Sequence, residues 1–362
     1  MKAVVLLGGE GTRLRPLTYT TPKQLLPVVE VPMLERVLTH LRAHGVDEVV
    51  LSLGYRPDAF FAAYPDHEAV GVRLDYAVEP EPLDTAGAIA FAAGHAGIDE
   101  TFIVVNGDVL SDVDTSALVA FHRSHGATAT IHLKAVDDPT RFGVVPTDAD
   151  GRVIEFVEKP PADKVPTNLI NAGTYVLEPE VLERIPAGRR VSVERETFPA
   201  LAAHGQVFAM ASDAYWLDTG TPAAYLQANV DLLNGTRPGL PAPGARQVSV
   251  GVWTLGAPVV RGEVHGPSLL GTGAQIAHDS TVTASVIGAR AVVERGAHVE
   301  NSVLLPGARV GEGARVVGSI LGHDCVVAAG CELSPVTVVG DEFEVPEGAR
   351  LVDARVPAEM AS

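Results

Sequence analysis

A repeat of 17 residues in the C-terminal third constrains the fold more than any other feature of this sequence. Four copies run without a gap from Leu269 to Val336, and the first two read LLGTGAQIAHDSTVTAS and VIGARAVVERGAHVENS. Three columns stay aliphatic in every copy: Leu270, Ile287, Leu304 and Leu321; Ile276, Val293, Val310 and Val327; and Val282, Val299, Val316 and Leu333, with Val338 extending the first column. Within a copy these positions are six residues apart, which predicts a triangular coil with one shortened side. Stacked turns would join the aliphatic columns into one continuous core.

This repeat resembles the hexapeptide repeat of left-handed parallel β-helices, which we predict for residues 251–356. The alternative is a β-sandwich of alternating strands. Just before the repeat, the stretch NGTRPGLPAPGA is rich in proline and glycine and predicts a linker at residues 236–250. Residues 1–235 are therefore expected to form a separate domain.

Strand and helix signals alternate in that first domain. AVVLL, DEVVLSLG and TFIVVNGD are strand-like, whereas MLERVLTHLRAHG and SALVAFHRSHG are helical, and Gly45 occupies a C-terminal capping position of the first helix. The alternation predicts an α/β, Rossmann-like domain with a mostly parallel sheet.

The net charge and its distribution along the chain limit the kinds of ligand that this protein can bind. The net charge is −18, which argues against binding nucleic acid or an anionic membrane. The first 25 residues are the exception, because Lys2, Arg13, Arg15 and Lys23 face only one acid, Glu10. A cationic spot in an acidic protein indicates a small anionic ligand. No apolar stretch approaches the roughly 18 residues of a membrane span, and MKAVVLLGG has no signal-peptide cleavage site, so we expect a cytoplasmic protein.

The stretch LLGGEGTRLRPLT combines bare backbone with positive charge. Amides of a glycine-rich turn after a strand can form a concave nest for phosphate oxygens. Thr12 and Arg13 follow Gly11 where a Walker A loop needs Lys and Ser or Thr, and Leu14 replaces the third glycine of a dinucleotide fingerprint. The glycines alone leave two interpretations open, a phosphate nest and a tight turn between strand and helix.

The longer stretch GGEGTRLRPLTYTTPKQLLPV resembles the signature of the nucleotide-sugar pyrophosphorylases, or sugar-1-phosphate nucleotidylyltransferases. EPLDTAGAIAF, VVNGDVL, FGVV, VEKP, NAGTYVL, VERETFP and YWLDTG also have counterparts in that family, in the same order. NAGTYVLEP and WLDTG are most similar to the mannose-1-phosphate guanylyltransferase branch, whereas PKQLLPV is shared with thymidylyltransferases that act on glucose-1-phosphate.

The resemblance implies that a sugar-1-phosphate oxygen attacks the α-phosphorus of a nucleoside triphosphate and releases pyrophosphate. The expected products are GDP-mannose and pyrophosphate from GTP and mannose-1-phosphate, and the expected assembly is a homo-oligomer. One alternative uses glucose-1-phosphate or another sugar or cyclitol phosphate with dTTP, ATP or GTP. Another is a non-catalytic regulatory subunit that binds nucleotide-sugar. A third is an acyltransferase in the β-helix, with His278, His298 and His323 as bases by residue type alone.

The resemblance also implies roles for individual residues. The catalytic set is Arg13, Lys23, Asp108 and Asp218, of which the two aspartates would hold Mg²⁺. The nucleotide-binding set is Leu7, Gly8, Gly9, Gly11, Thr12, Arg13, Glu81, Thr85, Gly87 and Asp108, and the sugar-phosphate set is Gly143, Glu158, Lys159, Asn171 and Gly173. Glu81 would accept hydrogen bonds from guanine N1–H and its 2-amino group, and Gly87 would let the base approach the backbone. Asp84 departs from the family glycine, but aspartate tolerates a left-handed turn.

Overall fold

The computed structural model describes residues 1–358, and its contacts divide the chain into two compact units. The sheet unit comprises Met1–Gly9 and Leu34–Trp216, and the coil unit comprises Glu10–Met33 and the chain from Leu217 onward. Most of the glycine-rich motif thus belongs, by its contacts, to the same unit as the C-terminal repeat. Among residues 1–358, no helix is both long and apolar enough to cross a membrane.

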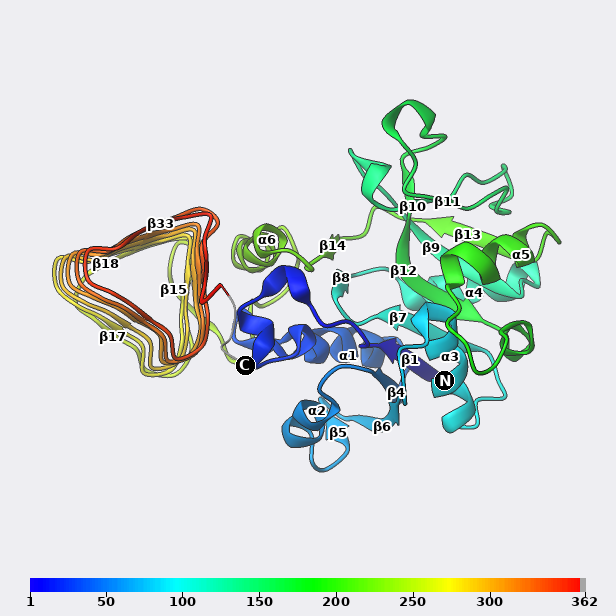
Figure 1. The fold of residues 1–362 in the computed structure, drawn as a ribbon, viewed down its shortest axis with the longest axis horizontal. Coiled ribbons are helices and arrows are strands. Elements are labelled where there is room, and N and C mark those ends of the chain that lie inside the picture. The colour runs from blue at the N-terminus through cyan, green and yellow to red at the C-terminus, as the bar shows by residue number, and fades with distance from the viewer. Residues whose placement is uncertain (359–362) are drawn as a thin grey trace. The chain divides into compact units, whose positions relative to one another are not determined.

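One large sheet forms the centre of the sheet unit (Figure 1). Its strands β7 (Phe102–Asn106), β1 (Lys2–Leu6), β4 (Glu48–Leu53) and β6 (Val72–Val78) lie side by side in that order and run parallel, as the sequence predicts. The other strands of the sheet are β5 (Glu68–Ala69), β9 (Ala129–Ala135), β10 (Gly143–Val144), β11 (Val157–Glu158), β12 (Leu169–Leu177) and β13 (Val207–Ala211). β12 runs antiparallel to β7 and opens the antiparallel flank of the sheet.

Helices of this unit follow the predicted alternation. They are α1 (Met33–Ala43), α2 (Pro57–Ala63), α3 (Asp84–His95), α4 (Thr115–His125) and α5 (Phe198–Ala202). The capping glycine predicted for α1, Gly45, has φ 82°, and α4 ends in the same way at Gly126, which has φ 56° and an amide that bonds back to the last turn. The buried face of α3 is built mainly from alanines with Ile89, and these small side chains let the helix lie close on β1 and β4.

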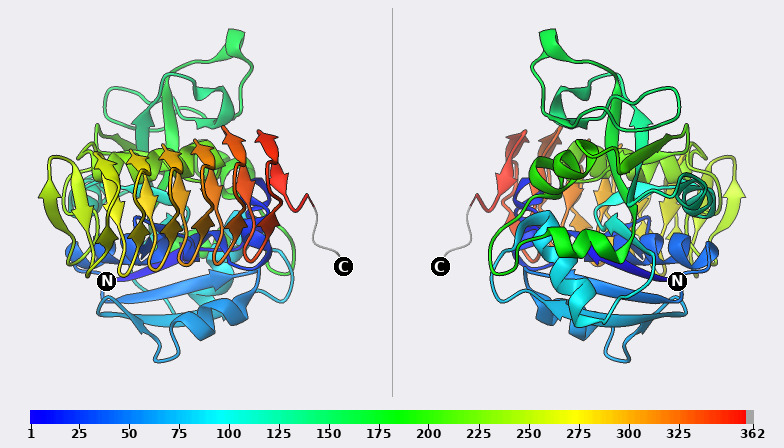
Figure 2. Two further views of the ribbon diagram at one scale, coloured as in Figure 1. Left: turned by 90° about the vertical axis from the view of Figure 1, so that its left-hand side faces the viewer. Right: turned by 90° about the vertical axis from the view of Figure 1, so that its right-hand side faces the viewer.

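The C-terminal repeat folds into a stack of triangular coils, seen end-on in Figure 1 and edge-on in Figure 2. Three sheets form its sides, and all their neighbouring strands run parallel except the first hairpin, β15 with β16. The first side contains β15 (Arg246–Ser249), β16 (Val252–Thr254), β19 (Ser268–Leu270), β22 (Val286–Ile287), β25 (Val303–Leu304), β28 (Ile320–Leu321), β31 (Val338–Val339) and β34 (Arg355–Val356). β15 lies within the stretch predicted as linker.

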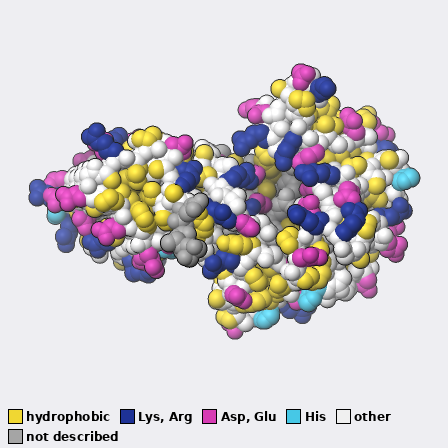
Figure 3. Space-filling model, in the orientation of Figure 1, with side chains coloured by type: hydrophobic (Ala, Val, Ile, Leu, Met, Phe, Trp, Pro, Cys, Tyr) yellow, Lys and Arg dark blue, Asp and Glu magenta, His cyan; other side chains and the backbone are white. Residues whose placement is uncertain are grey.

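The other two sides have six strands each. The second contains β17 (Val259–Val260), β20 (Gln275–Ile276), β23 (Val292–Val293), β26 (Arg309–Val310), β29 (Val326–Val327) and β32 (Glu344–Val345). The third contains β18 (Glu263–His265), β21 (Thr281–Thr283), β24 (His298–Glu300), β27 (Arg315–Val317), β30 (Glu332–Ser334) and β33 (Arg350–Val352). Apolar side chains lie in the middle of the triangle and charged ones around it (Figure 3).

The predicted columns face the interior, with one correction. All twelve aliphatic positions of the four copies belong to the coil core. Val338 does not extend the first column, because Leu321 pairs with Val339 and Ile320 with Val338. The last full coil contains 18 residues instead of 17, so the register moves by one and Val339 takes the inward place.

A ladder of buried hydroxyls marks one corner of the coils. The amide of each of Ser285, Ser302 and Ser319 donates to the Oγ of the serine 17 residues earlier, at 3.1 Å each time. Each hydroxyl thereby satisfies a corner amide that the strand ladders leave unpaired.

The rest of the coil unit lies before the coils in sequence. It contains β2 (Pro27–Val28), β3 (Val31–Pro32) and α6 (Pro222–Leu233). α6 begins at its cap Thr221, whose Oγ1 accepts from Ala224 N. The remaining short strands are β8 (Val109–Ser111) and β14 (Trp216–Asp218).

Candidate active site

In the sheet unit, the first glycines of the motif meet the candidate metal ligand Asp108. Leu6 pairs with Asn106 across β1 and β7, and the amide of Gly107 donates to Leu6 O at 3.1 Å. A Cβ at position 107 would lie 2.3 Å from Leu7 Cδ2 and 2.9 Å from Val5 Cγ1, so a larger residue would force these side chains to move. Leu7, Gly8 and Asp108 therefore lie together at the carboxyl ends of two parallel strands, which is where ligands bind in such sheets.

The structure adds Glu79 to this site, a residue that the sequence interpretation did not select. Glu79 Oε1 lies 3.5 Å from where a Cβ on Gly8 would be, and accepts from Ser52 Oγ at 3.1 Å. Its Oε2 accepts from Leu83 N at 3.0 Å. Glu81, the predicted base reader, is exposed. Glu79 therefore fixes the loop that carries Glu81 next to the glycine motif.

The rest of that loop enters α3. Asp84 has φ 62°, so the aspartate occupies the left-handed conformation that a family glycine would favour, as predicted. Thr85 Oγ1 donates to Glu194 Oε2 at 2.8 Å and accepts from Val193 N at 2.8 Å. Gly87 is buried, and its amide donates to Val191 O at 3.2 Å. In this structure Thr85 and Gly87 hold the chain segment around residue 191, and their contacts with a base stay predictions.

Two residues of the sugar-phosphate set come together at a bend in β12. Gly173 has φ 74°, and a Cβ there would lie 2.6 Å from Nδ2 of Asn106. Asn171 Oδ1 accepts from Gly173 N at 3.1 Å, and its Nδ2 donates to Tyr175 Oη at 2.9 Å. Burial raises the pKa of Tyr175, so its hydroxyl stays protonated. Asn106, which no prediction named, thus joins this cluster.

Glu158 and Lys159 form the second part of the sugar-phosphate set. Gly143 pairs with Glu158 across β10 and β11, and a Cβ on Gly143 would lie 3.0 Å from Glu158 Oε2. Lys159 Nζ lies 3.3 Å from Glu158 Oε1, and the lysine side chain is 60% exposed. Without a ligand the two side chains form a partly exposed ion pair, which contributes little to stability and can open at small cost.

The coil unit holds the second half of the glycine motif. Gly11 has φ 65°, and its carbonyl accepts from Thr18 Oγ1 at 2.9 Å and from Leu14 N at 2.8 Å. A short 3₁₀ turn, Thr12–Leu14, follows and leaves Thr12 and Arg13 exposed. The chain therefore presents the Arg13 guanidinium from a fixed turn.

Three of the four predicted catalytic residues belong to this unit, and two of them, Arg13 and Asp218, lie together. A Cβ on Gly11 would lie 3.2 Å from Lys23 Cβ, so the stem of Lys23 passes along the glycine turn. A Cβ on Gly220 would lie 2.6 Å from Arg13 Nη2 and 2.8 Å from Asp218 Oδ1, and Asp218 Oδ1 accepts from Gly220 N at 2.8 Å. Arg13 and Asp218 thus share the bare backbone of Gly220.

Arg15, the other arginine of the motif, has a structural position. Its Nη2 lies 2.8 Å from Glu10 Oε2, and its guanidinium carbon lies 5.2 Å from the ring centre of Tyr19. Both contacts are local, so Arg15 stiffens the loop that carries Arg13.

Residues 1–358 bring no three His, Cys, Asp or Glu side chains together as a ready-made metal site. Asp218 Oδ1 accepts a hydrogen bond from Gly220 N. Because a carboxylate offers about four acceptor positions, Asp218 can still bind a cation. A magnesium ion that takes most of its ligands from phosphates and water fits such a sparse donor set.

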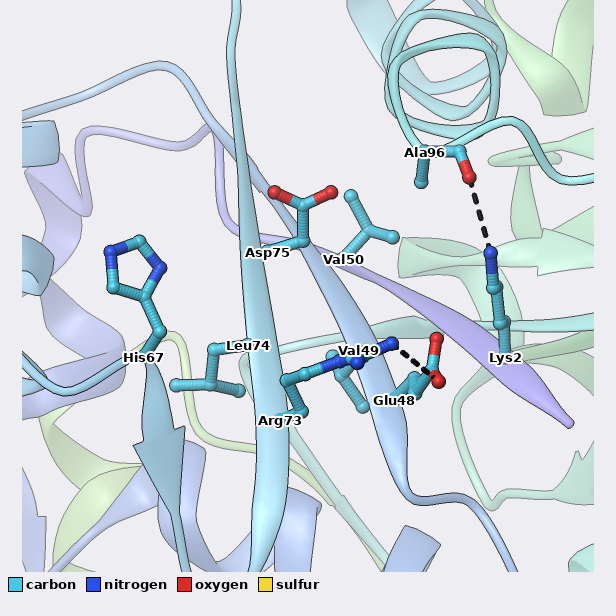
Figure 4. A pocket seen from close by; sticks show the side chains of 9 residues that line it. All are labelled: Lys2, Glu48, Val49, Val50, His67, Arg73, Leu74, Asp75 and Ala96. Atoms are coloured by element: carbon cyan, nitrogen blue, oxygen red, sulfur yellow. Dashed lines mark hydrogen bonds and ion pairs between the residues drawn. The ribbon is translucent and has the colours of Figure 1, made fainter.

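A separate polar hollow lies at the opposite ends of the strands (Figure 4). Lys2, Glu48 and Arg73 surround it near the starts of β1, β4 and β6, and its volume is about 400 Å³. Lys2 Nζ donates to Ala96 O at 3.2 Å, and Arg73 pairs with Glu48. This hollow contains none of the predicted site residues, and its charged groups Lys2, Arg73 and Glu48 already have hydrogen-bond or ion-pair partners.

Two of the three candidate histidines of the β-helix make local contacts. His298 Nε2 lies 3.1 Å from Glu300 Oε2, and His323 Nδ1 lies 3.2 Å from Asp341 Oδ1. Neither arrangement points toward acyl transfer.

Comparison with known proteins matches residues 2–235 to the family model "Nucleotidyl transferase" and residues 264–359 to "GMPPB C-terminal domain". A mannose-1-phosphate guanylyltransferase of Mycobacterium tuberculosis is 43% identical over 297 residues, which cover 79% of this chain and 82% of that protein. Mannose-1-phosphate guanylyltransferase 1 of Arabidopsis thaliana is 42% identical over 230 residues, covering 62% of this chain and 63% of its own length.

Solved structures agree on the fold. HddC from Yersinia pseudotuberculosis, in complex with GMP-PN, is 32% identical, with a TM-score of 0.55 over 63% of this chain and 97% of its own. A putative glucose-1-phosphate thymidylyltransferase from Bacillus anthracis is 24% identical, with a TM-score of 0.57 over 63% and 94%, and supports the fold alone.

Proposed function

Because this chain belongs to the nucleotidyl transferase family, we propose that it makes GDP-mannose and pyrophosphate from GTP and mannose-1-phosphate. The observation that carries the proposal is the shared position of Arg13 and Asp218 at the bare backbone of Gly220, with Lys23 beside Gly11 in the same unit. In a protein of net charge −18, two cations on a glycine-rich segment of this kind favour a polyphosphate ligand. The guanylyltransferase relatives support the choice of substrates.

In the proposed reaction, a phosphate oxygen of mannose-1-phosphate attacks the α-phosphorus of GTP and pyrophosphate leaves. Negative charge builds up around that phosphorus in the transition state, so preplaced cations and accurate positioning supply the catalysis. Arg13 holds two triphosphate oxygens at once, because a guanidinium presents parallel N–H donors. Lys23 contacts the α-phosphate, and the backbone amides of Gly8, Gly9, Gly11 and Thr12 line the phosphate path.

Asp108 and Asp218 are the proposed ligands of Mg²⁺. The bound ion would neutralise charge on the phosphates as the bond to the leaving group breaks. This proposal is supported by the position of Asp108, two residues after the end of β7, and by the hydrogen bond that Asp218 accepts from Gly220 N.

Base selection falls to the loop after β6. Glu81 is exposed and can accept from guanine N1–H and the 2-amino group, a donor pair that adenine and thymine do not present. Glu79 keeps the loop in place through Leu83 N, with both its oxygens already bonded. Leu7, Thr85 and Gly87 complete the proposed nucleotide pocket.

The sugar phosphate is proposed to bind in the sheet unit. Opening of the Glu158–Lys159 pair would free the carboxylate for sugar hydroxyls and the ammonium for the 1-phosphate. Gly143, Asn171 and Gly173 supply close backbone approach and an amide for the sugar ring. We also propose that the enzyme acts in the cytoplasm as a homo-oligomer.

A matrix assay of pyrophosphate release, with four nucleoside triphosphates against several sugar-1-phosphates and Mg²⁺, tests the proposal. GTP with mannose-1-phosphate is expected among the best pairs. A preference for dTTP with glucose-1-phosphate would instead identify the thymidylyltransferase alternative, and nucleotide-sugar binding without turnover would identify the regulatory subunit. Asp108→Asn and Asp218→Asn are each expected to abolish turnover, and near-normal rates would refute the metal assignment.

A further inference from the structure

The chain between the two proposed phosphate-binding cations, Arg13 and Lys23, lies directly on a corner of the β-helix. Thr20 Oγ1 donates a hydrogen bond to Asp341 Oδ2. Gly340 lets the same corner approach Pro16 closely, because a Cβ on Gly340 would lie 3.2 Å from both Cβ and Cγ of Pro16. The coil therefore touches the motif at two points within a few residues of each cation.

Asp341 is itself held firmly by the neighbouring coil. Its Oδ1 accepts from His323 N at 2.7 Å and lies 3.2 Å from His323 Nδ1. Burial alone would raise the pKa of Asp341, but the hydrogen bonds from His323 and Thr20 outweigh burial and lower it. The corner thus presents Thr20 with an ionised acceptor that is already oriented.

A strained turn follows Lys23 in the same segment. Val29 has φ 48° and Glu30 has φ 63°, and these two residues connect β2 to β3. A two-residue hairpin of type I′ needs positive φ at both loop positions, which favours Asn-Gly and disfavours a β-branched residue such as Val29. Such a conformation persists only where the surroundings enforce it.

The surroundings of the turn include the β-helix again. Val29 N donates to Asn229 Oδ1 of α6 at 2.7 Å. Glu30 Oε2 accepts from Ala289 N at 3.1 Å and lies 2.9 Å from where a Cβ on Gly271 would be. Ala289 and Gly271 belong to corners of successive coils, so Glu30 is bound to the β-helix backbone itself.

We propose that the β-helix is the template that positions the triphosphate-binding segment, with Asp341 and Glu30 as its two positioning residues. This inference rests on the proposed function, because it assumes that Arg13 and Lys23 bind nucleotide. The physical reason is that an error of about 1 Å in the placement of a catalytic cation can reduce the rate about a hundredfold. The coils, which parallel strand ladders hold together on three sides, give the segment that carries Arg13 and Lys23 a rigid support.

A double-mutant cycle on the first contact tests this. Thr20→Val and Asp341→Ala are each expected to raise the KM for nucleotide about tenfold, with the KM for sugar phosphate changed less than about twofold. The double variant should be no worse than Asp341→Ala, since both substitutions remove one interaction. Asp341→Asn keeps an acceptor for Thr20 and should restore most of the affinity.

The second contact is tested in the same way. Glu30→Ala is expected to raise the KM for nucleotide about tenfold, and Glu30→Gln, which keeps an oxygen for Ala289 N, should behave nearly as wild type. Glu332→Ala is the matched control, because it removes a β-helix carboxylate that pairs with exposed Arg350. The control should leave both KM values and kcat unchanged.

Calorimetric titration of nucleotide binding and thermal unfolding of each variant separate the outcomes. A purely structural contact would lower Tm and leave both KM values of the folded enzyme unchanged, which would overturn the inference. If wild type binds nucleotide but turns over no substrate pair, the proposed function fails, and weaker binding in Thr20→Val and Glu30→Ala would still support positioning. Unchanged nucleotide affinity in all these variants, or no nucleotide binding by wild type, would overturn it.

Discussion

Replacing Gly220 with alanine is expected to disable Arg13 and Asp218 together while leaving the fold intact. The new Cβ would lie 2.6 Å from Arg13 Nη2 and 2.8 Å from Asp218 Oδ1. Ordinary contacts of this kind begin near 3.4 Å, so the guanidinium has to retreat by about 0.8 Å. Gly220 has no positive φ, so its backbone accepts alanine, and the free energy of unfolding should change by less than about 1 kcal/mol.

The kinetic effect should be much larger than the effect on stability. A displacement near 1 Å at a catalytic cation predicts a fall of about a hundredfold in kcat/KM, which corresponds to about 2.7 kcal/mol of transition-state stabilisation. Steady-state pyrophosphate release with GTP and mannose-1-phosphate measures kcat/KM, and urea unfolding measures stability. Gly94→Ala is the matched control, because a Cβ there meets nothing within 4 Å and α3 should be slightly stabilised. Wild-type kcat/KM in Gly220→Ala would refute the placement of Arg13.

Three further predictions concern the sheet unit. Burial lowers the pKa of His132 to about 4, so the folded protein keeps it neutral, and up to about 3 kcal/mol of stability should be lost as pH falls from 6.5 to 4, as urea unfolding of wild type against His132→Gln measures. Gly173→Ala, whose Cβ would clash with Asn106 Nδ2, should raise the KM for sugar phosphate more than the KM for nucleotide. Asp84→Gly should leave stability within about 1 kcal/mol of wild type, whereas Asp84→Val should lose about 1–3 kcal/mol in thermal unfolding.

Each of these has a contrary outcome. Parallel pH profiles for wild type and His132→Gln would show that His132 titrates normally in the folded protein. Equal increases in both KM values for Gly173→Ala would place Gly173 outside the sugar-phosphate pocket. An Asp84→Val variant as stable as wild type would show that the loop before α3 relaxes without cost.

Sequence periodicity predicted the coil core because every inward position of a repeat is fixed by its neighbours above and below. The prediction that Val338 faces the core was wrong for a local reason, because one added residue in the last full coil shifts the register. No further copies of the repeat follow that would have revealed this shift in the sequence. The end of the first helix was also accessible from sequence, because the predicted capping residue Gly45 adopts a left-handed conformation that stops a helix.

Some site residues could likewise be recognised from the sequence, and others only from the structure. Gly11 and Arg13 lie inside a long motif that the sequence displays, whereas Glu79 is one of two carboxylates in EPEP, and only the proximity of Glu79 to Gly8 distinguishes it from Glu81. The contacts of Thr20 and Glu30 with the coils join residues more than 250 positions apart. Local patterns carry no information about such pairs, so sequence reasoning could not assign residues 10–33 to the coil unit.

The two cysteines of the chain, Cys325 and Cys331, are both sealed inside the stacked coils. Burial raises the pKa of Cys325, so neither access nor ionisation favours its alkylation in the native protein. The rate at which a thiol reagent labels the protein would therefore measure local opening of the β-helix alone. Mass spectrometry of the labelled chain would time that opening without interference from the catalytic half, which has no thiol to report.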